Sequence, residues 1–292
     1  MTNVGWIGLG AMGGPMAVVL AKAGHQVTAF DIAAGRAESL ATEGFAEAAD
    51  AKDAVADADV VALMVATPAQ VDAVLFGSDA LHKELKPGCV VLLMATVGPA
   101  AVLSLAERLA ADNIEVVDAP VSGGTKRAGE GDLLMMVSGS ERALGIVQPL
   151  LDAMASAAPV VGNSVGDGQK VKLVNQLLCG VHIAVAGEAL AFAESMGLDA
   201  AATWDVLRHG AAASFMLDDR GSRMIDPANE EVCSALDIFV KDMGLVVDAA
   251  RQSTYPAPLA NVAEQLYLSG RRAGLGRRDD SNIIEVLRGA MR

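Results

Sequence analysis

The chain has 292 residues, of which 52% are apolar and only 3% aromatic, and its formal net charge is −14. A chain of this length can bury a large core, and we expect two domains. The negative charge repels nucleic-acid backbones and anionic membrane surfaces at long range, so we expect neither nucleic acid nor membrane as a partner.

Three cysteines and four histidines are spread along the chain without a CxxC pair or two histidines at ligand spacing. This favours reduced thiols over a disulfide framework, and we expect no metal site. No stretch of 18 consecutive apolar residues occurs, and the first apolar strand begins at Val4, which leaves no room for a signal sequence. We therefore expect a cytoplasmic protein.

Residues 4–31 predict a dinucleotide-binding unit, with a strand Val4–Ile7, a glycine-rich loop, a helix ending at Gly24 and a second strand Gln26–Phe30. In such loops the first glycine permits a tight turn, the second admits a pyrophosphate, and the third lets helix and strand pack closely. The candidate cofactor-binding residues here are Gly8, Leu9, Gly10, Ala11, Met12 and Gly13.

Asp31 follows the second strand, 23 residues past Gly8. A carboxylate at about this distance accepts hydrogen bonds from a ribose 2′-hydroxyl and repels a 2′-phosphate, so we expect NAD rather than NADP. Arg36 could reach a 2′-phosphate or lie over the adenine, and a solvated helix residue is the simpler interpretation.

Up to about residue 161, strand-like runs alternate with helical ones, which predicts a parallel sheet covered on both faces. We therefore expect a Rossmann-type, doubly wound α/β domain over residues 1–163. After Asp31 the expected strands are Val60–Val65, Cys89–Met94, Ile114–Asp118, Leu133–Val137 and Pro159–Val161.

From residue 164 to 292 the alternation gives way to helical periodicity, so we expect an all-α domain joined by a long interdomain helix from Gln169 to about Met196. Asp199 and Ser281 are the expected N-caps of two later helices. The expected later helices are Asp199–Arg208, Ser214–Met224, Ser234–Gln252, Pro258–Ser269 and Ser281–Arg288.

Three segments carry candidate chemistry. Ser122, Gly123 and Gly124 follow a strand, where backbone N–H groups could hold a carboxylate, although a flexible connection would look alike. Lys172, Asn175, Gln176 and Cys179 share one face of the long helix, either at a cleft between the domains or as a solvated stripe. Lys241 has Asp237 four residues before it, so a surface ion pair explains it.

Taken together, these segments resemble the β-hydroxyacid dehydrogenase family, which includes 3-hydroxyisobutyrate dehydrogenase. The resemblance spans nearly the whole chain, with the motifs in the family's order: Gly8–Ala17, Pro120–Gly124, Gly168-Gln169 with Lys172 and Asn175, and Lys241-Asp242. Within the family, residues 213–216 and 234–244 resemble the L-threonate dehydrogenase branch.

The resemblance implies site roles. Lys172 becomes the catalytic acid/base, Ser122, Gly123 and Gly124 hold the substrate carboxylate, and Asn175 orients the substrate. Thr96, Val65, Ala66 and Lys241 become dinucleotide contacts. The chain departs from the family pattern at Gln176, at Val65-Ala66 and at Ala95, which bears on the shape of the substrate pocket.

The resulting hypothesis is an NAD-dependent oxidoreductase in which hydride leaves the carbinol carbon of a small hydroxy acid while Lys172 takes the hydroxyl proton. The acid is expected to be similar to L-threonate or 3-hydroxyisobutyrate. The alternatives are a tartronate semialdehyde or succinic semialdehyde type of reductase, and a dinucleotide-binding sensor without catalysis. Lys172 disfavours an imine reductase. Apolar stripes in the helical domain predict a homodimer or homotetramer.

Overall fold

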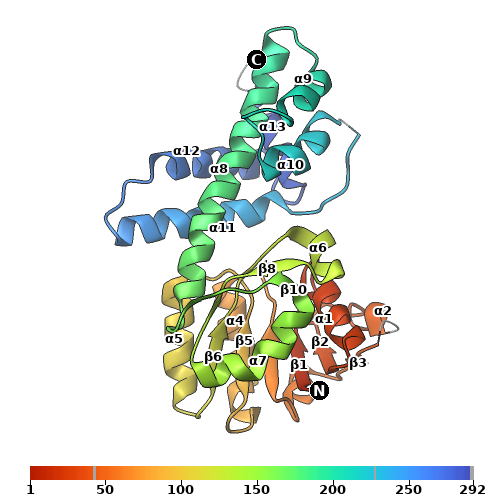
Figure 1. Cartoon of the computed structure of the whole chain (residues 1–292), viewed down its shortest axis with the longest axis vertical. Helices are drawn as coiled ribbons and strands as arrows, with labels where there is room; N and C mark the ends of the chain where they lie inside the picture. Colours follow the sequence, from red (N-terminus) through yellow and green to blue (C-terminus); the bar gives the residue numbers. More distant parts are fainter. Residues whose placement is uncertain (42–43, 227, 290–292) are drawn as a thin grey trace. The chain divides into compact units, whose positions relative to one another are not determined.

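The computed structural model describes residues 1–41, 44–226 and 228–289. The chain divides into two compact units, Met1–Lys172 and Leu173–Arg292. Figure 1 shows the chain coloured along the sequence, with labels on many of its helices and strands.

The first unit is built on an eight-stranded sheet in the order β11-β9-β6-β5-β4-β1-β2-β3. All neighbouring strands are parallel except β6 and β9, which pair antiparallel through Asp118 and Ser138. The strands are β1 (Asn3–Ile7), β2 (Gln26–Phe30), β3 (Ala46–Glu47), β4 (Val60–Leu63), β5 (Val90–Leu93), β6 (Glu115–Asp118), β9 (Val137–Ser138) and β11 (Val160–Gly162). The central strands β4 and β5 are buried along their whole length, as expected when helices cover both faces.

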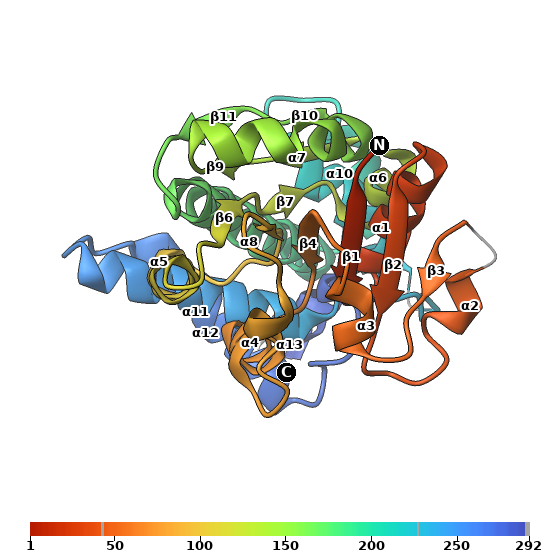
Figure 2. The ribbon, with the colours of Figure 1, turned by 90° about the horizontal axis from the view of Figure 1, so that it is seen from below.

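Helices lie on both faces of this sheet (Figure 2). On one face α1 (Gly13–Lys22), α6 (Gly124–Glu130) and α7 (Glu141–Met154) pack on the strand residues around Trp6. On the other, α3 (Ala51–Val55), α4 (Pro68–Phe76) and α5 (Pro99–Ala110) pack on the strand residues around Leu63. Two further short pieces are α2 (Glu38–Ala41) and η1 (Leu81–Glu84). The predicted doubly wound α/β fold is confirmed.

Sequence reasoning was wrong about the run Leu133–Val137, which forms two strands rather than one. Met136 separates β8 (Leu133–Met135) from β9, and β8 joins a second sheet in the order β10-β8-β7, with β7 (Val121–Ser122) and β10 (Ala155–Ala157). The strands β3, β7 and β10 were not predicted, because two or three residues give too short a pattern to distinguish from a loop.

The regular elements in the described residues of the second unit are helices, with an isolated β-bridge between Ala235 and Asp279. The long helix α8 (Asp167–Ser195) begins within the first unit and continues into the second. It is followed by α9 (Ala200–Leu207), α10 (Phe215–Ile225), α11 (Leu236–Gln252), α12 (Pro258–Arg272), η2 (Asp280–Asn282) and α13 (Ile283–Gly289). One face of α11 is buried, and the buried Tyr267 of α12 stacks on Phe239 of that face with ring centroids 5.3 Å apart.

The long helix α8 presents an unusual distribution of side chains. The apolar side chains of Val171, Val174 and Leu178 are exposed to solvent. The polar residues Lys172 and Gln176 are buried, each with a relative exposure of 6%. By length and composition, α8 is the one helix among the described residues that could cross a membrane, with half of its apolar window buried. Because a core helix passes the same test, this finding gives weak support to a membrane span.

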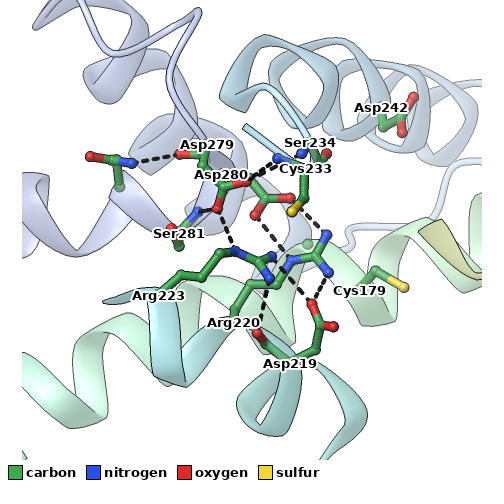
Figure 3. Close-up of polar contacts among 12 residues, drawn as sticks. Cys179, Asp219, Arg220, Arg223, Cys233, Ser234, Asp242, Asp279, Asp280 and Ser281 are labelled. Carbon is green, nitrogen blue, oxygen red and sulfur yellow. Dashed lines mark hydrogen bonds and ion pairs between the residues drawn. The ribbon is translucent and has the colours of Figure 1, made fainter. Parts of the chain in front are cut away.

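A cluster of charged side chains, here called the arginine–aspartate cluster, lies in the second unit (Figure 3). It consists of the buried Asp279 and Asp280 together with the partly buried Asp219, Arg220 and Arg223. Arg220 donates from Nε and Nη2 to the two oxygens of Asp280, both at 3.0 Å. Arg223 donates to Asp279 at 3.0 Å. These bonds tie α10 to η2.

The two predicted N-caps have different outcomes. The Asp199 side chain accepts from the backbone N–H of Ala202 at 2.7 Å and caps α9 as predicted. Ser281 does not cap a helix, because it lies inside η2, where the Asp279 carboxylate accepts its backbone N–H at 3.2 Å. The aspartate two residues earlier therefore takes the capping position.

Candidate active site

The glycine-rich loop after β1 has an open space in front of α1. Gly8 has φ +99°, and a side chain on Gly13 would come within 2.1 Å of the Gly8 carbonyl, so neither position accepts another residue without rearrangement. Gly10 has no heavy atom within 4 Å of where its Cβ would stand. The helix N-terminus thus faces a free approach of the kind that a pyrophosphate requires.

The peptide between Gly8 and Leu9 is held from both sides. The buried Trp6 indole donates from Nε1 to the Gly8 carbonyl at 2.8 Å, and the Leu9 N–H donates to Asp31 Oδ2 at 2.6 Å. Asp31 also accepts from the Ala33 N–H at 2.8 Å. The carboxylate expected to meet a ribose therefore lies against the glycine-rich loop. Sequence reasoning missed Trp6, although an indole in a buried strand needs a hydrogen-bond acceptor.

The sheet brings the other expected dinucleotide contacts of this unit to the same edge. Val65 follows β4, with its Cγ1 atom 3.2 Å from where a Gly8 side chain would stand. The Ala66 N–H donates to Gln70 Oε1 at 2.8 Å. Thr96 follows β5, the neighbour of β4 in the sheet. Because parallel strands end at a common edge, the residues after β1, β4 and β5 lie in sequence along it.

Gln169, in the first turn of α8, is a buried residue whose side chain reaches the end of β5. Its Oε1 atom accepts from the N–H groups of Val97 and Gly98, each at 2.9 Å. Its Nε2 atom donates to the Ala95 carbonyl at 3.0 Å and to Asp118 Oδ1 at 2.7 Å. We call this set of bonds the Gln169 clamp. Sequence reasoning counted Gln169 only as part of a family motif.

Asp118 and Ser138 hold the backbone at the same point. Asp118 Oδ2 accepts the Gln169 N–H at 2.8 Å, and Ser138 Oγ accepts the Gly168 N–H at 3.0 Å. Both side chains are buried at the ends of the antiparallel pair β6 and β9. Burial raises the pKa of Asp118 to about 6, and the hydrogen bonds from Gln169 and Ser138 oppose that rise.

The raised pKa of Asp118 predicts a pH-dependent contribution to stability. In the unfolded chain this carboxyl has a pKa near 3.9, so between pH 4 and 6 the folded state binds the extra proton. The stability that Asp118 contributes is present below pH 4 and is lost as pH rises through about 6. The loss is about 3 kcal/mol for a rise of this size.

The measurement is urea unfolding of the wild type and of Asp118→Asn at several pH values. Asparagine does not ionise, so the difference in unfolding free energy should move in favour of the variant by about 2 kcal/mol between pH 4 and 7, the remainder of the effect lying below pH 4. Other titrating groups are common to both proteins and cancel in the difference. A difference independent of pH would contradict the raised pKa.

The structure brings Lys172 to the loop that begins with Ser122. The buried Lys172 ammonium group donates from Nζ to the carbonyl of Val121 at 2.7 Å. Ser122 is the last residue of β7, and Gly123 and Gly124 follow with φ values of +145° and +77° at the start of α6. An amine, a hydroxyl and the N–H groups of a glycine pair therefore lie within one small region of the first unit.

In the second unit, a chain of hydrogen bonds connects two predicted site residues. Asn175 donates to Gln176 Oε1 at 2.8 Å, and Gln176 donates to the buried Asp242 at 2.5 Å. Lys241 pairs with Asp242 at 2.5 Å. Asp237, the expected surface partner of Lys241, accepts a hydrogen bond from Arg271 at 2.6 Å. The buried carboxylate at 242 thus connects Lys241 to the amide at 175.

No group of three or more histidine, cysteine or acidic side chains in the described part of the chain is arranged to hold a metal ion. Burial raises the pKa of the Cys89 thiol to about 11, which keeps that side chain protonated at neutral pH.

Comparison with known families covers almost the whole chain. A family model described as the NAD binding domain of 6-phosphogluconate dehydrogenase matches residues 3–166. A second, described as NAD-binding of NADP-dependent 3-hydroxyisobutyrate dehydrogenase, matches residues 166–287.

Individual proteins of known name are similar over their full length. An L-threonate dehydrogenase from Cupriavidus necator is 40% identical over 98% of this chain and 96% of its own. A 2-hydroxy-3-oxopropionate reductase from Escherichia coli is 31% identical over 98% of this chain and 97% of its own. The crystal structure of a 3-hydroxyisobutyrate dehydrogenase from Salmonella typhimurium superposes with a TM-score of 0.92 at 38% identity, covering 98% of this chain and 100% of that one.

Proposed function

The chain belongs to the β-hydroxyacid dehydrogenase family, and from that premise we propose that it oxidises L-threonate, or a short hydroxy acid close to it, with NAD as its cofactor. Membership makes it an oxidoreductase that acts on CH–OH groups of small hydroxy acids with a nicotinamide dinucleotide. The choice of L-threonate is supported by the 40% identity to a named L-threonate dehydrogenase.

The observation that carries the proposal is the placement of Lys172 beside the loop at Ser122. We assign Lys172 as the acid/base, because its buried amine is 2.7 Å from the carbonyl that precedes Ser122. In oxidation, the neutral amine accepts the hydroxyl proton of the substrate, and in the reverse reaction the ammonium donates it. A bound nicotinamide ring supplies the hydride acceptor.

Ser122, Gly123 and Gly124 are proposed to bind the substrate carboxylate. A net charge of −14 repels an anion from the protein as a whole, so capture of a hydroxy acid needs local donors. A serine hydroxyl and N–H groups of two glycines in left-handed backbone conformations supply such donors. Asn175 is proposed to orient the substrate, with its amide held by Gln176 and thus by Asp242.

The dinucleotide is proposed to lie along the carboxyl edge of the first unit. The loop Gly8, Leu9, Gly10, Ala11, Met12 and Gly13 would bind the pyrophosphate, and Asp31 the ribose. Val65, Ala66 and Thr96 are assigned to the same edge, and Lys241 is assigned as a contact from the helical part. Asp31 favours NAD, because a 2′-phosphate would face its carboxylate.

We propose that residues 1–163 form the dinucleotide-binding domain and residues 164–292 the substrate and association domain of a cytoplasmic homodimer or homotetramer. Association is supported by large apolar side chains exposed on the single chain, including Val174, Phe192, Leu259 and Val262. Light scattering of the purified protein at micromolar concentration would measure the assembly, and a monomer would contradict this part of the proposal.

A second candidate is reduction in the opposite direction, on a semialdehyde acid. The similarity to a 2-hydroxy-3-oxopropionate reductase supports it, and the same residues would serve, with Lys172 donating the proton. A dinucleotide-binding sensor without catalysis is disfavoured, because it gives no reason for burying an amine beside Ser122.

The test is a screen of NAD reduction over L-threonate, 3-hydroxyisobutyrate and glycerate, each paired with the matching alcohol that lacks the carboxyl group. We expect turnover of at least one acid and no measurable turnover of the alcohols. The Ser122→Ala variant should raise KM for the acid about tenfold, since one hydrogen bond to a charged group is lost. Equal rates on acid and alcohol would refute the carboxylate site.

A further inference from the structure

We propose that Gln169 is a positioning residue that fixes the acid/base Lys172 at a set distance from the segment carrying Thr96. The inference deepens the proposed function, since it takes Lys172 as the acid/base and Thr96 as the nicotinamide-side contact. It concerns a residue without a part in the chemistry itself, and it rests on the Gln169 clamp described above.

The clamp uses every polar atom of the Gln169 amide. Two N–H groups point at its oxygen, while a carbonyl and a carboxylate face its nitrogen. Only one orientation of the amide satisfies all four partners, because exchanging oxygen and nitrogen would set donor against donor and acceptor against acceptor. A fully satisfied, buried amide of this kind specifies one position of its partners.

The bonds of the clamp bracket Thr96 on both sides. The amide bonds to the carbonyl of Ala95 on one side, and to the N–H groups of Val97 and Gly98 on the other. The backbone carrying Thr96 is therefore held by the side chain at 169. Lys172 comes three residues after Gln169 in the same helix, about one turn along α8.

The helix end that carries the clamp is itself fixed. The N–H groups of Gly168 and Gln169 bind Ser138 and Asp118, at the ends of β9 and β6. A side chain at Gly168 would come within 2.4 Å of the Met136 carbonyl, so the first turn of α8 lies directly on the backbone of the first unit. At neutral pH the Asp118 carboxylate is ionised and only accepts hydrogen bonds, which keeps the Gln169 nitrogen turned toward it.

Position matters here because proton and hydride transfers need reacting atoms within a few tenths of an ångström of the productive geometry. A displacement of about 1 Å, even from a change remote from the reacting atoms, can cost about 100-fold in rate. Removal of the clamp frees the segment 95–98 and the first turn of α8 from each other. It should therefore lower the rate of the chemical step more than it weakens cofactor binding, because the glycine-rich loop is untouched.

The experiment compares Gln169→Met, which keeps the length of the side chain and removes its hydrogen bonds, with Lys170→Met as the matched control. Lys170 is the next residue on α8, is exposed, and pairs with Asp167 across one turn. For Gln169→Met we expect kcat to fall about 10- to 100-fold, with Kd for NADH changed less than about threefold. Lys170→Met should match the wild type in both.

A second readout does not depend on catalysis. The N–H groups of Val97 and Gly98 should be protected from hydrogen exchange in the wild type and in Lys170→Met, and should exchange at least about tenfold faster in Gln169→Met. If Gln169→Met does not fold, Gln169→Asn takes its place. The shorter amide cannot reach all of its hydrogen-bond partners at once, so this variant should change both readouts in the same direction.

The inference would be overturned by a kcat of the folded variant within twofold of the wild type, or by unchanged exchange at Val97 and Gly98. A fall in kcat matched by an equal loss of NADH affinity would also overturn it, since that pattern indicates a general loss of structure. If the wild type oxidises no hydroxy acid, the proposed function fails, whereas hydrogen exchange and NADH binding still test the clamp.

Discussion

Replacement of Lys172 by alanine should lower kcat for hydroxy-acid oxidation at least about 100-fold, because the group that accepts the substrate proton is removed. The amine is buried and donates to the Val121 carbonyl beside Ser122. The glycine-rich loop and Asp31 are unchanged in the variant. The Kd for NADH should therefore stay within about threefold of the wild-type value.

Lys172→Arg separates proton transfer from charge. A guanidinium keeps the positive charge at all accessible pH values and cannot give up a proton to act as a base. If Lys172 acts as the acid/base, the arginine variant should be as inactive as the alanine variant. If the residue only stabilised negative charge, the arginine variant should retain much of the activity.

The measurement is steady-state kinetics with the acid identified by the screen, together with NADH titration by fluorescence. Lys170→Ala serves as the control for a lysine removed from the same helix turn, and its kcat should equal that of the wild type. Turnover by Lys172→Ala close to the wild-type value would refute the assignment, even if the protein proves to be a dehydrogenase of this family.

The first unit could be predicted in outline, because its information is local. Each buried strand is a short apolar run between turn residues, and the loop at Gly8 has a spacing that few other structures require. The antiparallel placement of β9 could not be predicted, since β8 and β9 are one apolar run interrupted only at Met136. Which sheet each half joins depends on partners distant in the sequence.

The site shows the same division between local and distant information. The helical spacing of Lys172, Asn175 and Gln176 follows from the sequence, and so does their common face. The partners of Gln169 lie 51 to 74 residues away in the sequence. Gln176 and its partner Asp242 lie 66 residues apart. An amide in a sequence gives no indication of which distant groups will satisfy it. The sequence suggested Asp237, four residues before Lys241, as a partner, and the structure shows that the adjacent Asp242 pairs with Lys241.

Replacement of Asp280 by asparagine should lower the free energy of unfolding of the second unit by about 3 kcal/mol. The change leaves the buried guanidinium of Arg220 without its bidentate partner, and breaking a buried pair costs about 3–5 kcal/mol. The lower end of that range applies, because Asp219 still pairs with Arg220. Urea unfolding followed by fluorescence of Trp204, whose indole binds the Leu217 carbonyl in the same unit, measures the change.

The matched control is Asp248→Asn, which breaks an exposed pair with Arg251 on α11. Exposed pairs contribute about 0–1 kcal/mol, so this variant should differ little from the wild type. A loss of the same small size for Asp280→Asn would show that the arginine–aspartate cluster does not stabilise the second unit.

Removal of Arg220, the partner of Asp280, should change the free energy of unfolding with a different pH dependence. Burial raises the pKa of Asp280, and Arg220 opposes that rise. In Arg220→Met the carboxyl can relieve its buried charge by taking up a proton, whereas the guanidinium left in Asp280→Asn stays charged. A carboxyl whose pKa is raised in the folded state contributes most to the stability of the protein below its unfolded pKa. The free energy of unfolding of Arg220→Met should therefore recover as pH falls from 7 toward 4. The deficit of Asp280→Asn relative to the wild type should not shrink in this way, and recovery of both variants alike would contradict the assigned roles.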